Sequence, residues 1–109
     1  MDMLREYGTD AVRYWAASAR LGVDTTFDPA QLKIGRRLAV KILNASRFVL
    51  GMDRPASAGL RVTEPLDQAL LRRLADVVDQ CTEAFEAYDH ALALALTERF
   101  FWFFCDYYL

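Results

Sequence analysis

The segment from Gln31 to Gly51 constrains the fold most, because its charged and apolar side chains separate at the spacing of an α-helix. At about 100° per residue, the polar side chains fall within an arc of roughly 140°; they are Lys33, Arg36, Arg37, Lys41, Asn44 and Arg47. The opposite side carries apolar side chains: Ile34, Leu38, Ala39, Ile42, Leu43, Ala45, Val49 and Leu50. This pattern predicts a helix with one face buried in a core and the other face available to an anion.

The charge of this segment differs from the charge of the rest of the chain. It holds five basic residues and no acid, whereas the whole chain of 109 residues has a net charge of −2. The segment 66–89 contains two arginines and six acids, a net charge of −4. Screening at physiological salt acts over about 8 Å, so a partner on the basic helix would sense mainly that helix. A solvated face usually mixes both signs, and a face of one sign favours anion binding.

The first half of the chain contains signals for two helices and none for a strand. An alanine-rich segment predicts a helix from about Asp10 to Leu21, with Thr9 as its N-cap. Asp28 followed by Pro29 predicts the start of the basic helix, because aspartate caps the first turn and proline suits its first position. Gly51 is a plausible residue for the end of that helix.

The second half of the chain predicts two further helices after a loop at residues 52–64. Thr63 and Pro65 indicate the start of the first of them. A change of hydrophobic phase at Tyr88-Asp89 predicts a tight turn, and a last helix from about His90 follows it. That last helix is apolar nearly all round, which is typical of a helix at the centre of a bundle.

Long helices with short connections predict an all-α fold, an antiparallel helical bundle. The chain ends at Leu109 without a capping residue or a charged tail, so we expect a bundle truncated at the C-terminus. Its apolar last helix would then expose a patch able to drive self-association. The most apolar run, from Phe100 to Leu109, is too short to span a bilayer, so no membrane partner is expected.

The residue types that carry catalysis are sparse. His90 lies at a predicted helix start, where a surface or capping role is more common than a chemical one. Ser18 and Ser46 have no base at a motif spacing, and Cys81 and Cys105 lack metal-ligand spacing. We therefore expect no catalytic residue, no metal site and no cofactor in this segment. Two thiols without a secretion signal favour a cytoplasmic location.

The aromatic residues of the last helix allow two interpretations. A row of aromatic side chains can form a stacking platform for bases, but at helical spacing it is more often part of a core. We expect a core role for this row, with Tyr107 and Tyr108 as exceptions. Trp15 is likewise expected to pack in the core.

Three blocks of the sequence resemble class I aminoacyl-tRNA synthetases. Residues 7–13 read YGTDAVR and resemble the YG-x-DA-x-R segment that follows the KMSKS loop in the valine, isoleucine and leucine group. Residues 43–49 read LNASRFV and residues 101–109 read FWFFCDYYL. In this order the blocks are most similar to the valyl-tRNA synthetase family, and the resemblance covers nearly the whole chain.

The resemblance implies that the chain is part of a longer ligase that attaches valine to tRNA(Val) with ATP and Mg²⁺. The HIGH and KMSKS motifs of the family are missing, so this segment would not itself be catalytic, and the upstream catalytic domain would be a partner. Residues 1–28 would be linker and stem-contact helices. Residues 29–109 would be part of the anticodon-binding helical bundle, which binds the anticodon arm and inner stem.

The basic helix would then bind the tRNA backbone, since lysine and arginine neutralise phosphates and supply affinity and orientation. Asn44 has a donor and an acceptor for a base edge or a 2′-OH. Asp10 and Arg13 lie one turn apart and are expected to pair. Two alternatives remain open: a connector whose basic face docks on an acidic protein surface, and an unrelated helical interaction protein.

Overall fold

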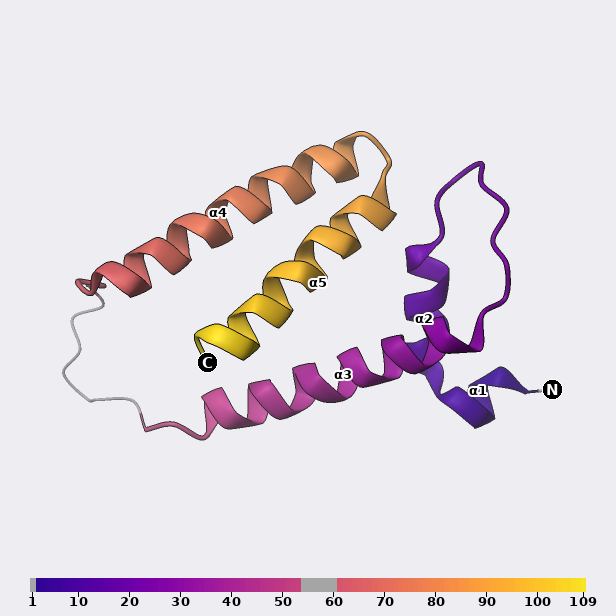
Figure 1. Ribbon diagram of the computed structural model, residues 1–109, viewed down its shortest axis with the longest axis horizontal. Coiled ribbons are helices and arrows are strands. Elements are labelled where there is room, and N and C mark those ends of the chain that lie inside the picture. Colours follow the sequence, from indigo (N-terminus) through magenta and orange to yellow (C-terminus); the bar gives the residue numbers. More distant parts are fainter. Residues whose placement is uncertain (1, 54–60) are drawn as a thin grey trace.

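The computed structural model describes residues 2–53 and 61–109. In this part of the chain every regular element is an α-helix, which confirms the expected all-α class (Figure 1). The helices are α1 (Met3–Tyr7), α2 (Thr9–Ser18), α3 (Pro29–Leu50), α4 (Pro65–Glu86) and α5 (His90–Tyr107). None of the helices in the described residues is long and apolar enough to cross a membrane.

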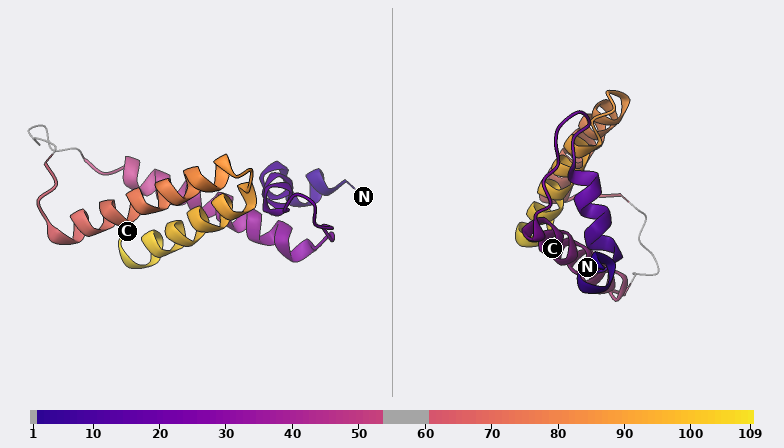
Figure 2. Two further views of the ribbon diagram at one scale, coloured as in Figure 1. Left: turned by 90° about the horizontal axis from the view of Figure 1, so that it is seen from above. Right: turned by 90° about the vertical axis from the view of Figure 1, so that its right-hand side faces the viewer.

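The helices pack in two groups, α1–α3 and α4–α5, which are joined by a contact between α2 and α5. The short helices α1 and α2 lie at the N-terminal part of α3, and α4 runs antiparallel to α5 (Figure 1). Helix α2 also contacts α5. The molecule is elongated, 53 × 32 × 20 Å, as Figure 2 shows. Its radius of gyration is 17.0 Å, against about 13 Å for a compact domain of this size, so the bundle is open.

The core at the α2–α3 contact depends on a glycine. Ala11 and Leu32 are fully buried there, and Leu38 is nearly so. A Cβ atom on Gly35 would lie 2.6 Å from Cβ of Tyr14, whereas carbon atoms in contact are about 3.5–4.0 Å apart. The absence of a side chain at Gly35 therefore allows the two helices to approach this closely.

The predicted turn between the last two helices is confirmed. Tyr88 adopts a left-handed conformation with φ 58°, and Asp89 then caps α5 by accepting a hydrogen bond from Leu92 N at 3.1 Å. The small residues Ala84 and Ala93 are buried between α4 and α5. The turn and the small residues together bring the two antiparallel helices close.

The start and end of the basic helix also agree with the prediction. Asp28 accepts a hydrogen bond from Ala30 N at 2.9 Å, with Pro29 at the first helical position. Helix α3 ends at Leu50, and Gly51 follows with φ −82°. Gly51 therefore lies in the right-handed region and does not use the left-handed conformation that favours glycine at helix ends.

The predicted N-cap of α2 was wrong, whereas the predicted start of α4 at Pro65 agrees with the structure. Gly8, with φ 88°, precedes α2, so Thr9 is the first residue of that helix rather than its cap. Glu64 precedes α4 in an extended conformation, because a proline at the first helical position forces the residue before it out of the helical region. Helix α4 therefore begins at Pro65, and Thr63 lies in the segment before it.

Other boundaries also differ from the prediction. Helix α2 ends at Ser18 rather than Leu21, and the Ser18 hydroxyl donates to Trp15 O at 2.8 Å in the last turn. The short helix α1, capped by Asp2, had not been predicted. Of the loop expected at 52–64, residues 54–60 lie outside the described residues.

The apolar side of α3 is only partly buried, contrary to the prediction. Leu38 is buried, but five of the other residues are exposed within this chain: Ile34, Ile42, Leu43, Val49 and Leu50. Helices α1 and α2 contact α3 near its N-terminal end (Figure 1). The later turns of α3 face Phe101 and Phe104 of α5 only across an open cavity of about 370 Å³, so they are less buried than the sequence pattern predicted.

The predicted apolar patch on the last helix is not supported. The aromatic residues from Phe100 to Phe104 are half-buried, and Phe103 and Phe104 pack on Tyr107 and Tyr108, with ring centroids 5.4 and 5.6 Å apart. Most of the exposed large apolar side chains instead lie on α3 and α4. Self-association through α5 therefore has no support in the structure.

Candidate nucleic-acid interface

The basic residues of α3 form a cationic face, defined here as Lys33, Arg36, Arg37, Lys41 and Arg47. All of these side chains are exposed except that of Lys41, which is half-buried. Among residues 2–53 and 61–109, ion pairing is limited to Asp2 and Arg5, at 3.1 Å. No described acid therefore neutralises the cationic face through an ion pair.

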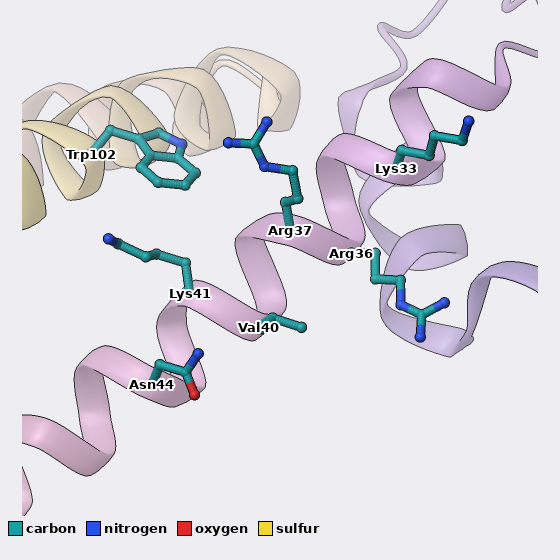
Figure 3. Close-up of a pocket in the computed structure, with 7 residues that line it drawn as sticks. All are labelled: Lys33, Arg36, Arg37, Val40, Lys41, Asn44 and Trp102. Atoms are coloured by element: carbon teal, nitrogen blue, oxygen red, sulfur yellow. The ribbon is translucent and has the colours of Figure 1, made fainter.

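Most of the cationic face borders one open cavity of about 560 Å³, the cationic groove. It is lined by Lys33, Arg36, Arg37, Val40, Lys41 and Asn44 of α3 and by Trp102 of α5. None of these residues is acidic. Figure 3 shows that Arg37 and Lys41 extend toward Trp102, whereas Arg36 points to the other side of α3. Arg47 does not line the groove and lies about one turn beyond Asn44.

Acidic side chains lie on both flanks of the groove. On the α5 side, Arg37 and Lys41 share a neighbouring cavity of about 490 Å³ with Glu98 and Asp106. On the α1–α2 side, Arg36 shares a cavity of about 420 Å³ with acids of the first helices. An anion is therefore attracted to the middle of the α3 face, and the flanking acids disfavour its binding at either edge.

Glu98 of α5 accepts a hydrogen bond from α2 and so joins the two helices beside the groove. Its Oε2 accepts a hydrogen bond from the Tyr14 hydroxyl at 2.8 Å, and its Oε1 accepts one from Trp102 Nε1 at 3.3 Å. Burial, the hydrogen bond to Glu98 and the charge of Glu98 raise the pKa of Tyr14 from 10.0 to about 12. The raised pKa extends the range in which the neutral phenol donates this hydrogen bond into alkaline solution.

Sequence reasoning did not identify Glu98 or the placement of Trp102. One signal was present, because Glu98 and Asp106 are the two acids of the mostly apolar α5. A carboxylate in such a helix needs a hydrogen-bond partner. The sequence pattern did not indicate that this partner would be Tyr14, 84 positions away in the chain.

The other residues that the sequence analysis considered lie outside the cationic groove. The ring of Trp15 packs edge-on against Phe27 with centroids 6.2 Å apart, as expected for a packing role. Asp10 and Arg13 do not form the predicted ion pair; both are exposed, and an exposed pair contributes little free energy to hold its geometry. His90 is half-buried at the start of α5. Within the described residues, no group of acids, histidines and cysteines is placed to hold a metal.

The chain has close relatives among curated proteins. No family model matches it, and no solved structure matches it. It is 60% identical to the valine--tRNA ligase of Leifsonia xyli over 99% of its own length. It is 59% identical to that of Thermobifida fusca and 58% identical to that of Salinispora arenicola, over its full length in both.

The alignments cover only a small part of each of these relatives. The chain spans 13% of the length of each of these three relatives. High identity over the whole chain confirms the resemblance drawn from its three sequence blocks. This chain therefore belongs to the valine--tRNA ligase family, and it corresponds to one segment of those longer proteins.

Proposed function

We propose that this chain is the part of a valine--tRNA ligase that binds and positions tRNA(Val) through the cationic face of α3. The observation that carries the proposal is that the cations of this face are accessible and, among the described residues, lack ion pairs. Its five cations are not buried, none is ion-paired with a described acid, and four of them line a groove without an acidic residue. The identity to valine--tRNA ligases supports tRNA as the anion.

Binding would be mainly electrostatic. From Lys33 to Arg47 the face is about 21 Å long at 1.5 Å per residue, which is enough to follow several phosphates of an RNA strand. Contacts to phosphates supply affinity and orientation but carry little sequence information. Asn44 is exposed in the middle of the face and would contact a base edge or a 2′-OH. The cations bind phosphates and read neither of these groups.

In this proposal the chain binds tRNA, and the rest of the ligase carries out the chemistry. Residues 1–28 would contact the inner stem of the tRNA and the catalytic domain, and residues 29–109 would bind the anticodon arm. Amino-acid activation with ATP and Mg²⁺ would take place in the catalytic domain, in the cytoplasm. Helices α1 and α2 pack against one end of α3, so the two parts would lie side by side on the tRNA.

Salt titration of tRNA(Val) binding by the intact ligase tests the proposal. If four or five phosphates are neutralised, log K against log salt should have a slope of roughly −3 to −4. Replacing both Arg36 and Arg37 by glutamine should weaken binding and make the slope shallower by about 1.5. Charge reversal, Arg36→Glu with Arg37→Glu, should abolish binding while the helix content measured by circular dichroism stays the same.

A matched control removes two exposed arginines away from the groove. Arg72→Gln with Arg99→Gln changes the net charge equally, but on α4 and α5. This variant should retain nearly the full slope, because its cations do not line the cationic groove. An equal loss of slope in both double variants would show that net charge, rather than this face, governs binding. No loss in either would contradict the proposal.

A further inference from the structure

We infer that Trp102 is a stacking surface for one unpaired nucleotide of the bound RNA, with the phosphate of that nucleotide held by Arg37 and Lys41. This inference rests on the proposed function. It adds a binding site for a single base beside the cationic face, which so far has been proposed to bind only phosphates. The groove volume of about 560 Å³ falls within the roughly 300–1,000 Å³ of small-molecule sites.

The lining of the groove matches the parts of a nucleotide. A base has a flat π-face, which stacks on an aromatic ring, and Trp102 provides the one aromatic ring of the lining. The backbone phosphate is an anion, and Lys41 Nζ lies 5.8 Å from the centre of that ring. Figure 3 shows Arg37 and Lys41 on α3 extending toward the indole of Trp102. A base on the ring therefore brings its own phosphate within reach of both cations.

Charge fixes the side of the ring on which the nucleotide lies. The indole borders two cavities, the cationic groove and the neighbouring cavity that contains Glu98 and Asp106. A phosphate is repelled by these two carboxylates and attracted to the acid-free groove. The nucleotide is therefore placed between Trp102 and α3 on the side of Val40 and Asn44.

Trp102 differs from the neighbouring aromatic residues of α5. Phe103 and Phe104 pack on the tyrosines that follow one turn later. The indole of Trp102 packs edge-on against Phe101, with centroids 6.0 Å apart, but it also donates from Nε1 to Glu98 at 3.3 Å, and Tyr14 of α2 donates to the other oxygen of the same carboxylate. Glu98 is thus a positioning residue that fixes the ring before RNA binds, which reduces the entropy lost on binding.

The experiment compares Trp102→Phe with Trp102→Leu in the intact ligase, with a tRNA(Val) transcript as the probe. Phenylalanine keeps a π-face, and leucine keeps an apolar side chain without one. Loss of base stacking weakens binding by about 5- to 150-fold, and we expect this loss for Trp102→Leu but little loss for Trp102→Phe. Trp102→Met is a second aliphatic variant in case leucine lowers the melting temperature.

Salt dependence separates stacking from phosphate binding. Trp102→Leu should leave the slope of log K against log salt unchanged, whereas Lys41→Gln should make it shallower by about 0.7–0.9. If the arginine and lysine variants weaken binding but Trp102→Leu binds like the wild type, this inference is wrong and the proposed function stands. If none of these variants changes binding, both are wrong.

Transcripts with a single abasic nucleotide identify the base. We expect one unpaired position at which removal of the base eliminates the effect of Trp102→Leu, because no base remains to stack. Tyr14→Phe removes a donor that holds Glu98 and changes no charge; it should also weaken binding, and its effect should disappear with the same abasic transcript. A leucine effect that persists with every abasic transcript would show that Trp102 only supports the packing of α5, and would overturn the inference.

Discussion

Replacing Gly35 by alanine should change the stability of the fold through two opposing effects, a gain in helix propensity and a steric clash with Tyr14. In the interior of an exposed helix this substitution stabilises by about 1 kcal/mol, since alanine has the higher helix propensity. Here the new Cβ would lie 2.6 Å from Cβ, 2.7 Å from Cγ and 2.8 Å from Cδ1 of Tyr14. Each distance falls short of ordinary carbon contact by about 1 Å.

The clash should outweigh the gain in propensity. Overpacking a buried site costs about 1–3 kcal/mol, and this case belongs in the upper half of that range because Cβ of Tyr14 cannot move by a rotamer change. Helices α2 and α3 must separate, which also strains the hydrogen bond from Tyr14 to Glu98. We therefore expect a net loss of about 1–2 kcal/mol in the free energy of unfolding.

Urea unfolding followed by circular dichroism measures this loss. Gly51→Ala is the matched control, because Gly51 has φ −82° and a Cβ there would meet only backbone oxygens, at 3.2 and 3.6 Å. We expect a change of a few tenths of a kcal/mol for the control. If Gly35→Ala is as stable as the wild type or more stable, the α2–α3 contact is not as close as described, and the explanation of Gly35 is refuted.

Two further predictions concern a helix cap and a titrating group. Asp28→Ala should lower the free energy of unfolding by about 1 kcal/mol through loss of the bond to Ala30 N, and Asp28→Asn should restore most of it in the same urea assay. For Tyr14, the folded pKa of about 12 exceeds the ordinary tyrosine value of 10.0, so its contribution to stability is complete below pH 10 and is lost as pH rises to about 12. The tyrosinate absorbance of the wild type minus that of Tyr14→Phe measures this titration, and a midpoint near 10 would contradict the assignment.

The sequence predicted best the features whose causes lie within a few residues. Asp28-Pro29 combines a side-chain acceptor with a fixed φ, and both act on the turn that directly follows. Pro65 likewise marks the start of α4, although Glu64 before it makes no capping hydrogen bond with its side chain. The cap at Gly8 was missed because its φ of 88° reflects the close succession of α1 and α2, and the short helix α1 had left no clear periodic signal.

Burial of the α3 apolar face was predicted less well for a different reason. Periodicity identifies which side chains would gain from burial, but it contains no information on how many neighbouring helices are present. Leu32 and Leu38 are buried where α2 crosses α3, whereas Ile42 and Leu43 are exposed farther along. The exposure of the cations was easier to predict, since an unpaired charge stays in water wherever the neighbouring helices lie.

The groove was beyond the reach of sequence reasoning because it is formed by residues of two helices far apart in the chain. The cations of α3 follow from local pattern, but the seventh lining residue, Trp102, belongs to a run that periodicity assigns to a core. What distinguishes Trp102 is its bond to Glu98, and what holds Glu98 is Tyr14. The same Tyr14 packs against Gly35, so one contact sets both the α2–α3 distance and the position of the indole. A substitution at Gly35 should therefore weaken RNA binding as well as stability, although Gly35 itself is buried away from the groove.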